Sequence, residues 1–145
     1  MRRTWILVVV VGTALVVASS ALAKTIEQSG QVLGDTNSSV TLDVKKKKKK
    51  LKKVKNFQFE NVTAECQGKD SPPIEVAATL PTMKVFDKKQ FSANIDGING
   101  PDTDVKVDGT LKKKGKKAVG TLDYSQGKGQ ERCRTGRVDF RTKKV

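Results

Sequence analysis

The chain has 145 residues, of which 29 are Lys or Arg and 15 are Asp or Glu, and its formal net charge at pH 7 is +14. It contains no His, which removes the usual general base, the relay of a catalytic triad and the commonest zinc ligand. Its length fits one domain and is too short for two ordinary ones.

The first 23 residues have the pattern of a cleavable export signal. Two arginines precede an apolar run over residues 5–18, and the segment ends in Ala-Leu-Ala, which suits signal peptidase. A membrane anchor is the alternative, but a spanning helix needs about 20 apolar residues and this run is shorter. Lys24 stands where a lipid-modified Cys would follow cleavage. We therefore expect a secreted protein, extracellular or in the periplasm and cell envelope, with residues 24–145 as one domain and no transmembrane anchor after cleavage.

The first strands are predicted by alternating polar and apolar residues. Residues 39–44 alternate regularly, and residues 54–66 form a longer candidate strand. In the longer segment the apolar parity changes between Phe59 and Val62, which predicts a bulge or turn near Asn61.

Two further strands are predicted in the middle of the chain. Pro residues bound residues 74–79, and residues 91–95 alternate again. Residues 96–104 read DGINGPDTD, which is typical of a turn.

A hairpin is predicted next. Residues 105–111 and 119–122 carry similar apolar patterns on either side of a lysine-rich interruption, with Gly115 at the tip. Gly109 and Gly120 fall within these strands, which indicates bulges or a close approach of the backbone.

The last predicted strand covers residues 133–141, with Val138 and Phe140 facing inward. Seven or eight short strands with no long helical period predict an all-β fold, a single antiparallel β-sandwich. A small β-barrel is the alternative architecture.

Cys66 and Cys133 are the two cysteines of the chain. In an oxidising compartment an even number of Cys predicts a disulfide, and this bond would tie an early strand to the last one. Two buried free thiols or a redox pair are the alternatives, although a dithiol catalyst normally has C-x-x-C spacing, which this pair lacks.

Two sequence patterns resemble those of a loose group of small secreted bacterial β-domain proteins of unknown function. They are F-x-F-x-N-V-x-A-x-C at residues 57–66 and C-x-T-G-x-V-x-F at residues 133–140. The resemblance covers the chain from about Gly30 onward. It implies a β-domain and brings no catalytic or binding residue with it.

Positive charge is concentrated in two lysine runs, with nine lysines in residues 45–55 and five in residues 112–117. The rest of residues 24–145 has a slightly negative net charge. Both runs are predicted to be exposed loops at hairpin tips, which would form one cationic patch if the hairpins point the same way. The candidate residues for binding a polyanion are Lys45, Lys46, Lys47, Lys48, Lys49, Lys50, Lys52, Lys53, Lys55, Lys112, Lys113, Lys114, Lys116 and Lys117.

These lysine runs predict non-specific docking on an anionic polymer or membrane surface outside the cytoplasm. The competing interpretation is that the lysines only solubilise hairpin tips and protect strand edges. Sequence-specific nucleic-acid binding is disfavoured, because arginine is scarce and Tyr124 and the five Phe residues are predicted to lie mostly in the core. A structural or assembly protein of the cell envelope, binding a protein partner through an edge strand, is the alternative function.

Enzyme chemistry is disfavoured, and we predict no catalytic residue, no cofactor and no metal site. Asp102, Asp104 and Asp108 form the closest carboxylate cluster, but they belong to a turn and to outward strand positions. The acidic ladder of a calcium-binding EF-hand loop is absent from this segment. An enzyme that uses carboxylates alone is the remaining enzymatic possibility.

Overall fold

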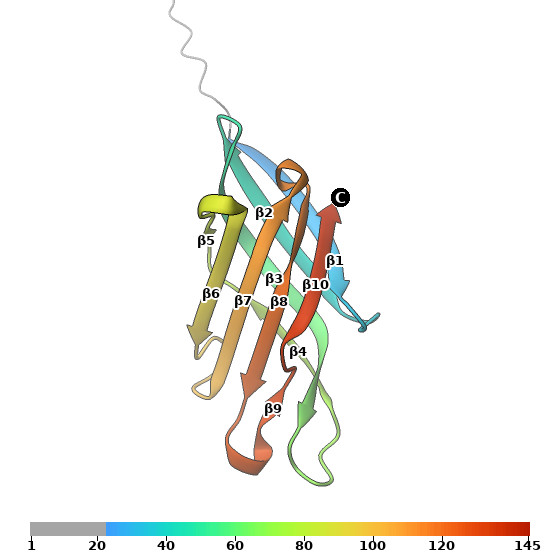
Figure 1. The fold of residues 1–145 in the computed structure, drawn as a ribbon. Helices are drawn as coiled ribbons and strands as arrows, with labels where there is room; N and C mark the ends of the chain where they lie inside the picture. Colours follow the sequence, from blue (N-terminus) through green and yellow to red (C-terminus); the bar gives the residue numbers. More distant parts are fainter. Residues whose placement is uncertain (1–22) are drawn as a thin grey trace, which may run out of the picture.

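The computed structural model describes residues 23–145 (Figure 1). The predicted export signal therefore lies outside the described residues, apart from Ala23. The strands are β1 (Lys24–Val32), β2 (Ser39–Lys47), β3 (Lys50–Cys66), β4 (Ile74–Thr79), β5 (Met83–Lys84), β6 (Gln90–Asp96), β7 (Thr103–Lys112), β8 (Lys117–Gln126), β9 (Cys133–Arg134) and β10 (Val138–Lys144). Three short 3-10 turns are η1 (Asp87–Lys89), η2 (Lys113–Gly115) and η3 (Gly129–Glu131). Within residues 23–145, no helix has the length and apolar character needed to cross a bilayer.

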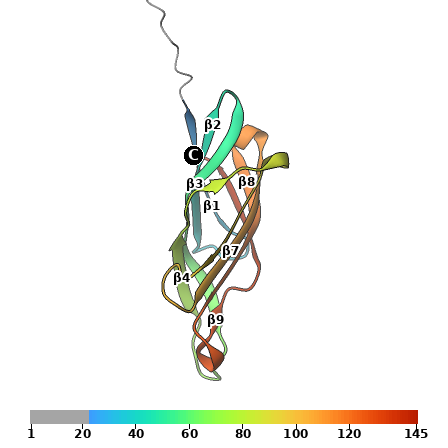
Figure 2. The same ribbon diagram turned by 90° about the vertical axis from the view of Figure 1, so that its left-hand side faces the viewer.

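All the strand pairs are antiparallel, and six strands close into a ring. The order is β10-β1-β2-β3-β9-β8, and β8 pairs in turn with β10. β7 and β6 extend the sheet beyond β8, while β4 and β5 pair with β3. The prediction of an antiparallel all-β domain is confirmed. The ring corresponds to the barrel alternative, flattened so that two walls of strands face each other as in a sandwich (Figure 2).

The structure has more strands than the sequence predicts. β1 was not predicted, because Gln28 occupies a buried position where a strand pattern would show an apolar residue. The last predicted strand is divided into β9 and β10, since Gly136 between them has a φ of 65°. β5 is a two-residue strand paired with β3 and is too short to leave a periodic signal.

Aromatic side chains form the centre of the core, as predicted for all but one of them. Phe57 packs edge-on against Phe140 with ring centroids 5.4 Å apart, and Phe59 packs similarly against Tyr124 at 5.9 Å. Phe91 is also buried. The prediction is wrong for Phe86, which is 58% exposed.

The predicted irregularities of the backbone are found in the strands. Asn61 has a φ of 53°, and the register of β3 against β4 shifts between Phe59 and Val62, which confirms the bulge. A second irregularity, not predicted, lies at Asn56, where φ is 50°. It restores the inward parity between Val54 and Phe57, which are both buried.

Gly109 and Gly120 lie directly opposite each other in β7 and β8, in a ladder that continues without a register shift. A Cβ added to Gly109 would stand 2.2 Å from Cζ of Phe91, and one added to Gly120 would stand 2.2 Å from the backbone oxygen of Asp108. Close approach, one of the two predicted reasons for these glycines, therefore explains both of them.

Cys66 and Cys133 form a disulfide, as predicted. The two residues are direct partners between β3 and β9. β9 also pairs with β8, so β9 connects β3 to β8 in the ring. The disulfide therefore links this short strand covalently to the long strand β3.

Candidate functional site

Three lysine-bearing turns meet at one end of the barrel, which we call the lysine end. They are the β2–β3 turn at Lys48 and Lys49, η1, and η2. In Figure 1 all three lie at the same end, where the C-terminus also lies and where the chain enters β1. The hairpins that carry the two predicted lysine runs therefore point the same way.

Each of the three turns contains two consecutive lysines in the left-handed backbone region. The φ values are 48° and 66° at Lys48 and Lys49, and 48° and 57° at Lys113 and Lys114. In η1 the same pattern is found, with φ of 60° and 64° at its two lysines. This region normally favours Gly or Asn. All three turns have lysine at these positions instead.

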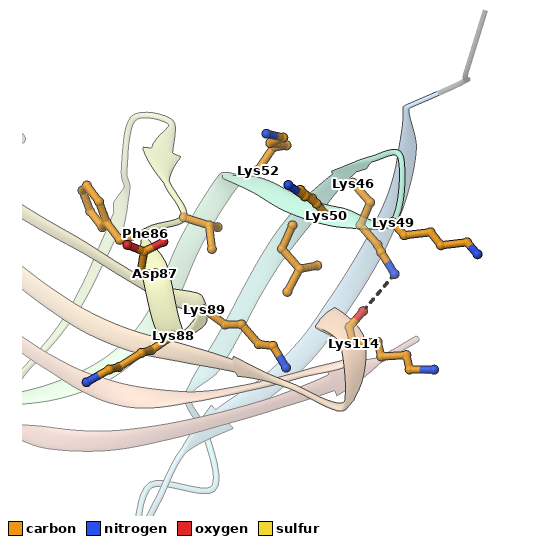
Figure 3. Close-up of a pocket in the computed structure, with 11 residues that line it drawn as sticks. Lys46, Lys49, Lys50, Lys52, Phe86, Asp87, Lys88, Lys89 and Lys114 are labelled. Atoms are coloured by element: carbon orange, nitrogen blue, oxygen red, sulfur yellow. Dashed lines mark hydrogen bonds between the residues drawn. The ribbon is translucent and has the colours of Figure 1, made fainter.

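A groove of about 930 Å³ lies between these turns, and we call it the lysine groove. Figure 3 shows its lysines extending from the β2–β3 hairpin, from η1 and from η2 around the groove. Among the described residues that line it, Asp87 is the one acid, and three side chains are apolar. The lining residues are Lys46, Lys49, Lys50, Leu51, Lys52, Val85, Phe86, Asp87, Lys88, Lys89 and Lys114.

Hydrogen bonds position the turns around the groove. Nζ of Lys46 donates to the carbonyl oxygen of Lys114 at 3.2 Å (Figure 3), which joins the two lysine-rich hairpins. The backbone N–H of Val85 donates to the carbonyl oxygen of Lys52 at 3.0 Å, and that of Phe86 donates to Gln90 at 2.8 Å. The η1 segment is therefore attached to β3 and closed as a compact turn.

The positive charges of the lysine groove have no paired carboxylates. The ion pairs of residues 23–145 join Lys106 to Asp108 at 4.0 Å and Lys128 to Asp102 at 2.8 Å, and none involves a groove lysine. The hydrogen bond and the charge of Asp102 raise the pKa of Lys128. The lysine groove is thus an open concentration of cations, which attracts anions over distances comparable to the Debye length, about 8–10 Å in physiological salt.

The predicted lysines are divided among several positions. Five of them line the lysine groove, namely Lys46, Lys49, Lys50, Lys52 and Lys114. Three line a second groove beside Arg141 and Lys143, namely Lys113, Lys116 and Lys117. The remaining six lie outside both grooves, namely Lys45, Lys47, Lys48, Lys53, Lys55 and Lys112.

The prediction that residues 45–55 form a loop is wrong. This run continues β2 to Lys47 and begins β3 at Lys50, so that a two-residue turn is all that separates the strands. Both strands extend into the lysine run, because Val44 and Val54 pair across the hairpin and face the core. The second run forms a tip at η2, with Gly115 in it, as predicted.

Six of the residues that line the lysine groove are not among the predicted candidates, and three of them bear on its charge and its apolar surface, namely Phe86, Lys88 and Lys89. Lys88 and Lys89 form an isolated pair between Asp87 and Gln90, and two lysines are too few to define a charge run. Phe86 is one of the aromatic residues that the sequence predicts to lie mostly in the core. These three residues lie between the predicted strands at residues 74–79 and 91–95. That position indicates a turn at one end of the sheet, and it is the feature of the sequence that could have located them.

The carboxylates considered in the sequence do not form a common site. Asp102 is paired with Lys128 and Asp108 with Lys106, while Asp104 stands opposite Asp96 and Ser125 on an exposed strand position. Within the described part of the chain, no group of three or more His, Cys, Asp or Glu residues is arranged to hold a metal ion.

Comparison of the chain with protein-family models, with curated proteins and with solved structures gave no match. The resemblance to small secreted bacterial β-domain proteins therefore stays a prediction.

Proposed function

We propose that this protein is an exported, non-enzymatic binding module that docks on polyanions outside the cytoplasm through its lysine end. The observation that carries the proposal is the convergence of three left-handed lysine pairs, from turns far apart in the chain, on one end of the barrel. Such a backbone conformation costs roughly 1–2 kcal/mol per non-Gly residue. Lysine at six such positions is best explained by a use for its charge.

The pairing of the strands supports the same conclusion. Lys45 lies directly opposite Lys53, Lys47 opposite Lys50, and Lys112 opposite Lys117. Like charges directly opposite each other destabilise a sheet. Solubility alone would be served by fewer lysines mixed with acids, so the solubilising interpretation leaves this repeated cost unexplained.

The chemistry of the lysine end favours binding without sequence selectivity. Lysine is a compact point charge, and the planar fork of arginine, which recognises phosphate in a bidentate manner, is absent from the lysine groove. Affinity should therefore depend on the density of negative charge in the ligand and fall steeply with salt through counterion release.

A charge-removal experiment with matched variants tests this proposal. Lys49→Asn, Lys89→Asn and Lys114→Asn together remove one charge from each turn, and Asn tolerates the left-handed backbone. The control variant carries Lys69→Asn, Lys106→Asn and Lys128→Asn, which removes the same charge from exposed positions away from the lysine end. Binding to heparin, duplex DNA and anionic vesicles is measured at about 50 and 200 mM salt.

We expect the lysine-end variant to bind anionic vesicles roughly a hundredfold more weakly, since each lysine near an anionic surface contributes about 1 kcal/mol. The control variant should lose much less. Equal losses in both variants would show that net charge alone drives adsorption. Unchanged binding in the lysine-end variant would refute the proposal.

The second candidate is an assembly protein that binds a protein partner by strand addition. In residues 23–145, β6 pairs with β7 on one side, and β4 pairs with β3 on one side, which leaves strand edges of the kind that β-augmentation uses. Under this alternative, partner capture is lost when Pro replaces a residue of β6 and is unaffected by the lysine-end variant.

A further inference from the structure

Phe86 is the one exposed aromatic side chain among residues 23–145, and it stands in the wall of the lysine groove. Its exposure of 58% follows from the backbone. The N–H of Phe86 donates to Gln90, and the preceding residue, Val85, is held against β3. A short closed turn therefore presents the ring to solvent, while every other described aromatic is buried.

The surroundings of Phe86 combine apolar surface with positive charge. Leu51 and Val85 are half-buried and line the same groove, with lysines of η1 and of the β2–β3 hairpin around them (Figure 3). Surfaces that bind the membrane interface have this composition, with Phe or Leu entering the acyl boundary and Lys contacting the phosphates. A single-stranded nucleic acid is served instead by several aromatic rings on which successive bases stack, and this groove has one.

The chain enters the domain at this same end. Lys24, the first residue of β1, pairs with Lys46 at the lysine end, so residues 1–23 join the barrel there. Their sequence includes the apolar run predicted to enter the membrane during export.

We infer that the polyanion bound by the lysine end is an anionic phospholipid bilayer, and that the Phe86 ring inserts at the boundary between headgroups and acyl chains. The inference rests on the proposed function, because the lysines supply the electrostatic attraction. It adds an apolar anchor, which DNA or a soluble polyanion would not engage.

The test uses the purified protein, recovered from cells that express the full chain, and vesicles of equal parts phosphatidylcholine and phosphatidylglycerol. Phe86→Ser should weaken partition into these vesicles roughly fivefold to tenfold, as expected when part of a Phe side chain loses an apolar environment. Binding of duplex DNA and of heparin should not change. Because Phe86 is exposed, the substitution leaves the core intact.

A second variant reports on insertion directly. Phe86→Trp should show a blue-shifted emission with these vesicles and quenching by brominated lipid, both measured as differences from the wild-type protein. Leu33→Trp is the matched control, because Leu33 is 48% exposed and follows the end of β1 opposite to Lys24. It should show neither effect.

The outcomes separate this inference from the proposed function. Weaker vesicle binding by Phe86→Ser, with unchanged DNA binding, supports membrane insertion. Equal weakening for DNA and vesicles overturns it, because the loss would then concern polyanion binding in general and not entry into the acyl boundary. If Phe86→Ser and Phe86→Trp have no effect while the lysine-end variant loses vesicle binding, insertion is refuted and the proposed function stands. If the lysine-end variant also binds normally, both are refuted.

Discussion

Gln28 donates a hydrogen bond from Nε2 to the carbonyl oxygen of Gly115 at 2.7 Å, inside the barrel. Its Oε1 accepts a hydrogen bond from the hydroxyl of Thr142 in β10. Gln28 and Thr142 are almost completely buried. This small polar network joins β1 and β10 to the η2 turn, so that the position of Lys114 beside the lysine groove depends on a residue in the core.

Replacing Gln28 with Leu should lower the free energy of unfolding by about 2 kcal/mol, because the Gly115 carbonyl and the Thr142 hydroxyl lose their partner while buried. Urea unfolding followed by circular dichroism measures the change. Adding Thr142→Val should recover part of the loss, since it removes one of the unpaired groups. A Gln28→Leu protein as stable as the wild type would contradict the role of this network.

Replacing Lys48 with Asn and Lys49 with Gly should raise the free energy of unfolding by about 1 kcal/mol. Asn-Gly is the preferred pair where both residues of a two-residue hairpin turn have positive φ, as here. The same variant should bind polyanions less tightly. The control, Lys47→Gln with Lys50→Gln, removes the same charge from strand positions; an equal gain in the control would attribute the stabilisation to charge relief alone.

Gly109→Ala should destabilise the domain by about 1–3 kcal/mol, because the new methyl group would overlap the buried ring of Phe91. Thermal unfolding compares it with the wild type. Combining it with Phe91→Leu, whose shorter side chain leaves room for the methyl group, should cost less than the two single changes added together. Strict additivity would show that the glycine is not required by the Phe91 ring.

Removing the disulfide by Cys66→Ser with Cys133→Ser should cost about 2–4 kcal/mol of stability. The bond spans 67 residues of sequence, and its loss also leaves the two-residue strand β9 with few contacts to hold the ring closed. Denaturant unfolding of the variant should match that of reduced wild-type protein. Identical midpoints for the variant and the oxidised wild type would be inconsistent with this role.

Asp35 makes the stability depend on acidic pH. Slight desolvation raises the pKa of its carboxyl, but hydrogen bonds from the backbone and hydroxyl of Thr63 and from the backbone of Asn37 and Ser38 outweigh this, so the pKa is lowered on folding. A lowered pKa contributes stability above the unfolded value, about 3.9, which is lost as the pH falls below it. Wild type should therefore exceed Asp35→Asn in stability at pH 7 by more than at pH 2.5. A constant difference between the two pH values would exclude the effect.

Strands were predictable where several inward positions in succession are apolar. Val40, Leu42 and Val44 in β2 alternate with outward polar residues, and their burial follows from that order. The pattern fails at Gln28, because a buried amide satisfied by partners from other strands has no local signature. It fails again at Asn56, because Val54 is the one apolar residue of the predicted strand before this bulge, so no change of parity is visible there.

The amino-acid sequence by itself determined the all-β class, the pairing of Cys66 with Cys133 and the concentration of lysines in two runs. These properties depend on local periodicity, on having two cysteines, and on composition. The tertiary structure alone decided that η1 joins the two predicted runs and that Phe86 stands exposed among their lysines. Closure of the ring determines which way each hairpin points, and that direction depends on strand pairs distant in sequence, such as β10 with β1 and β8.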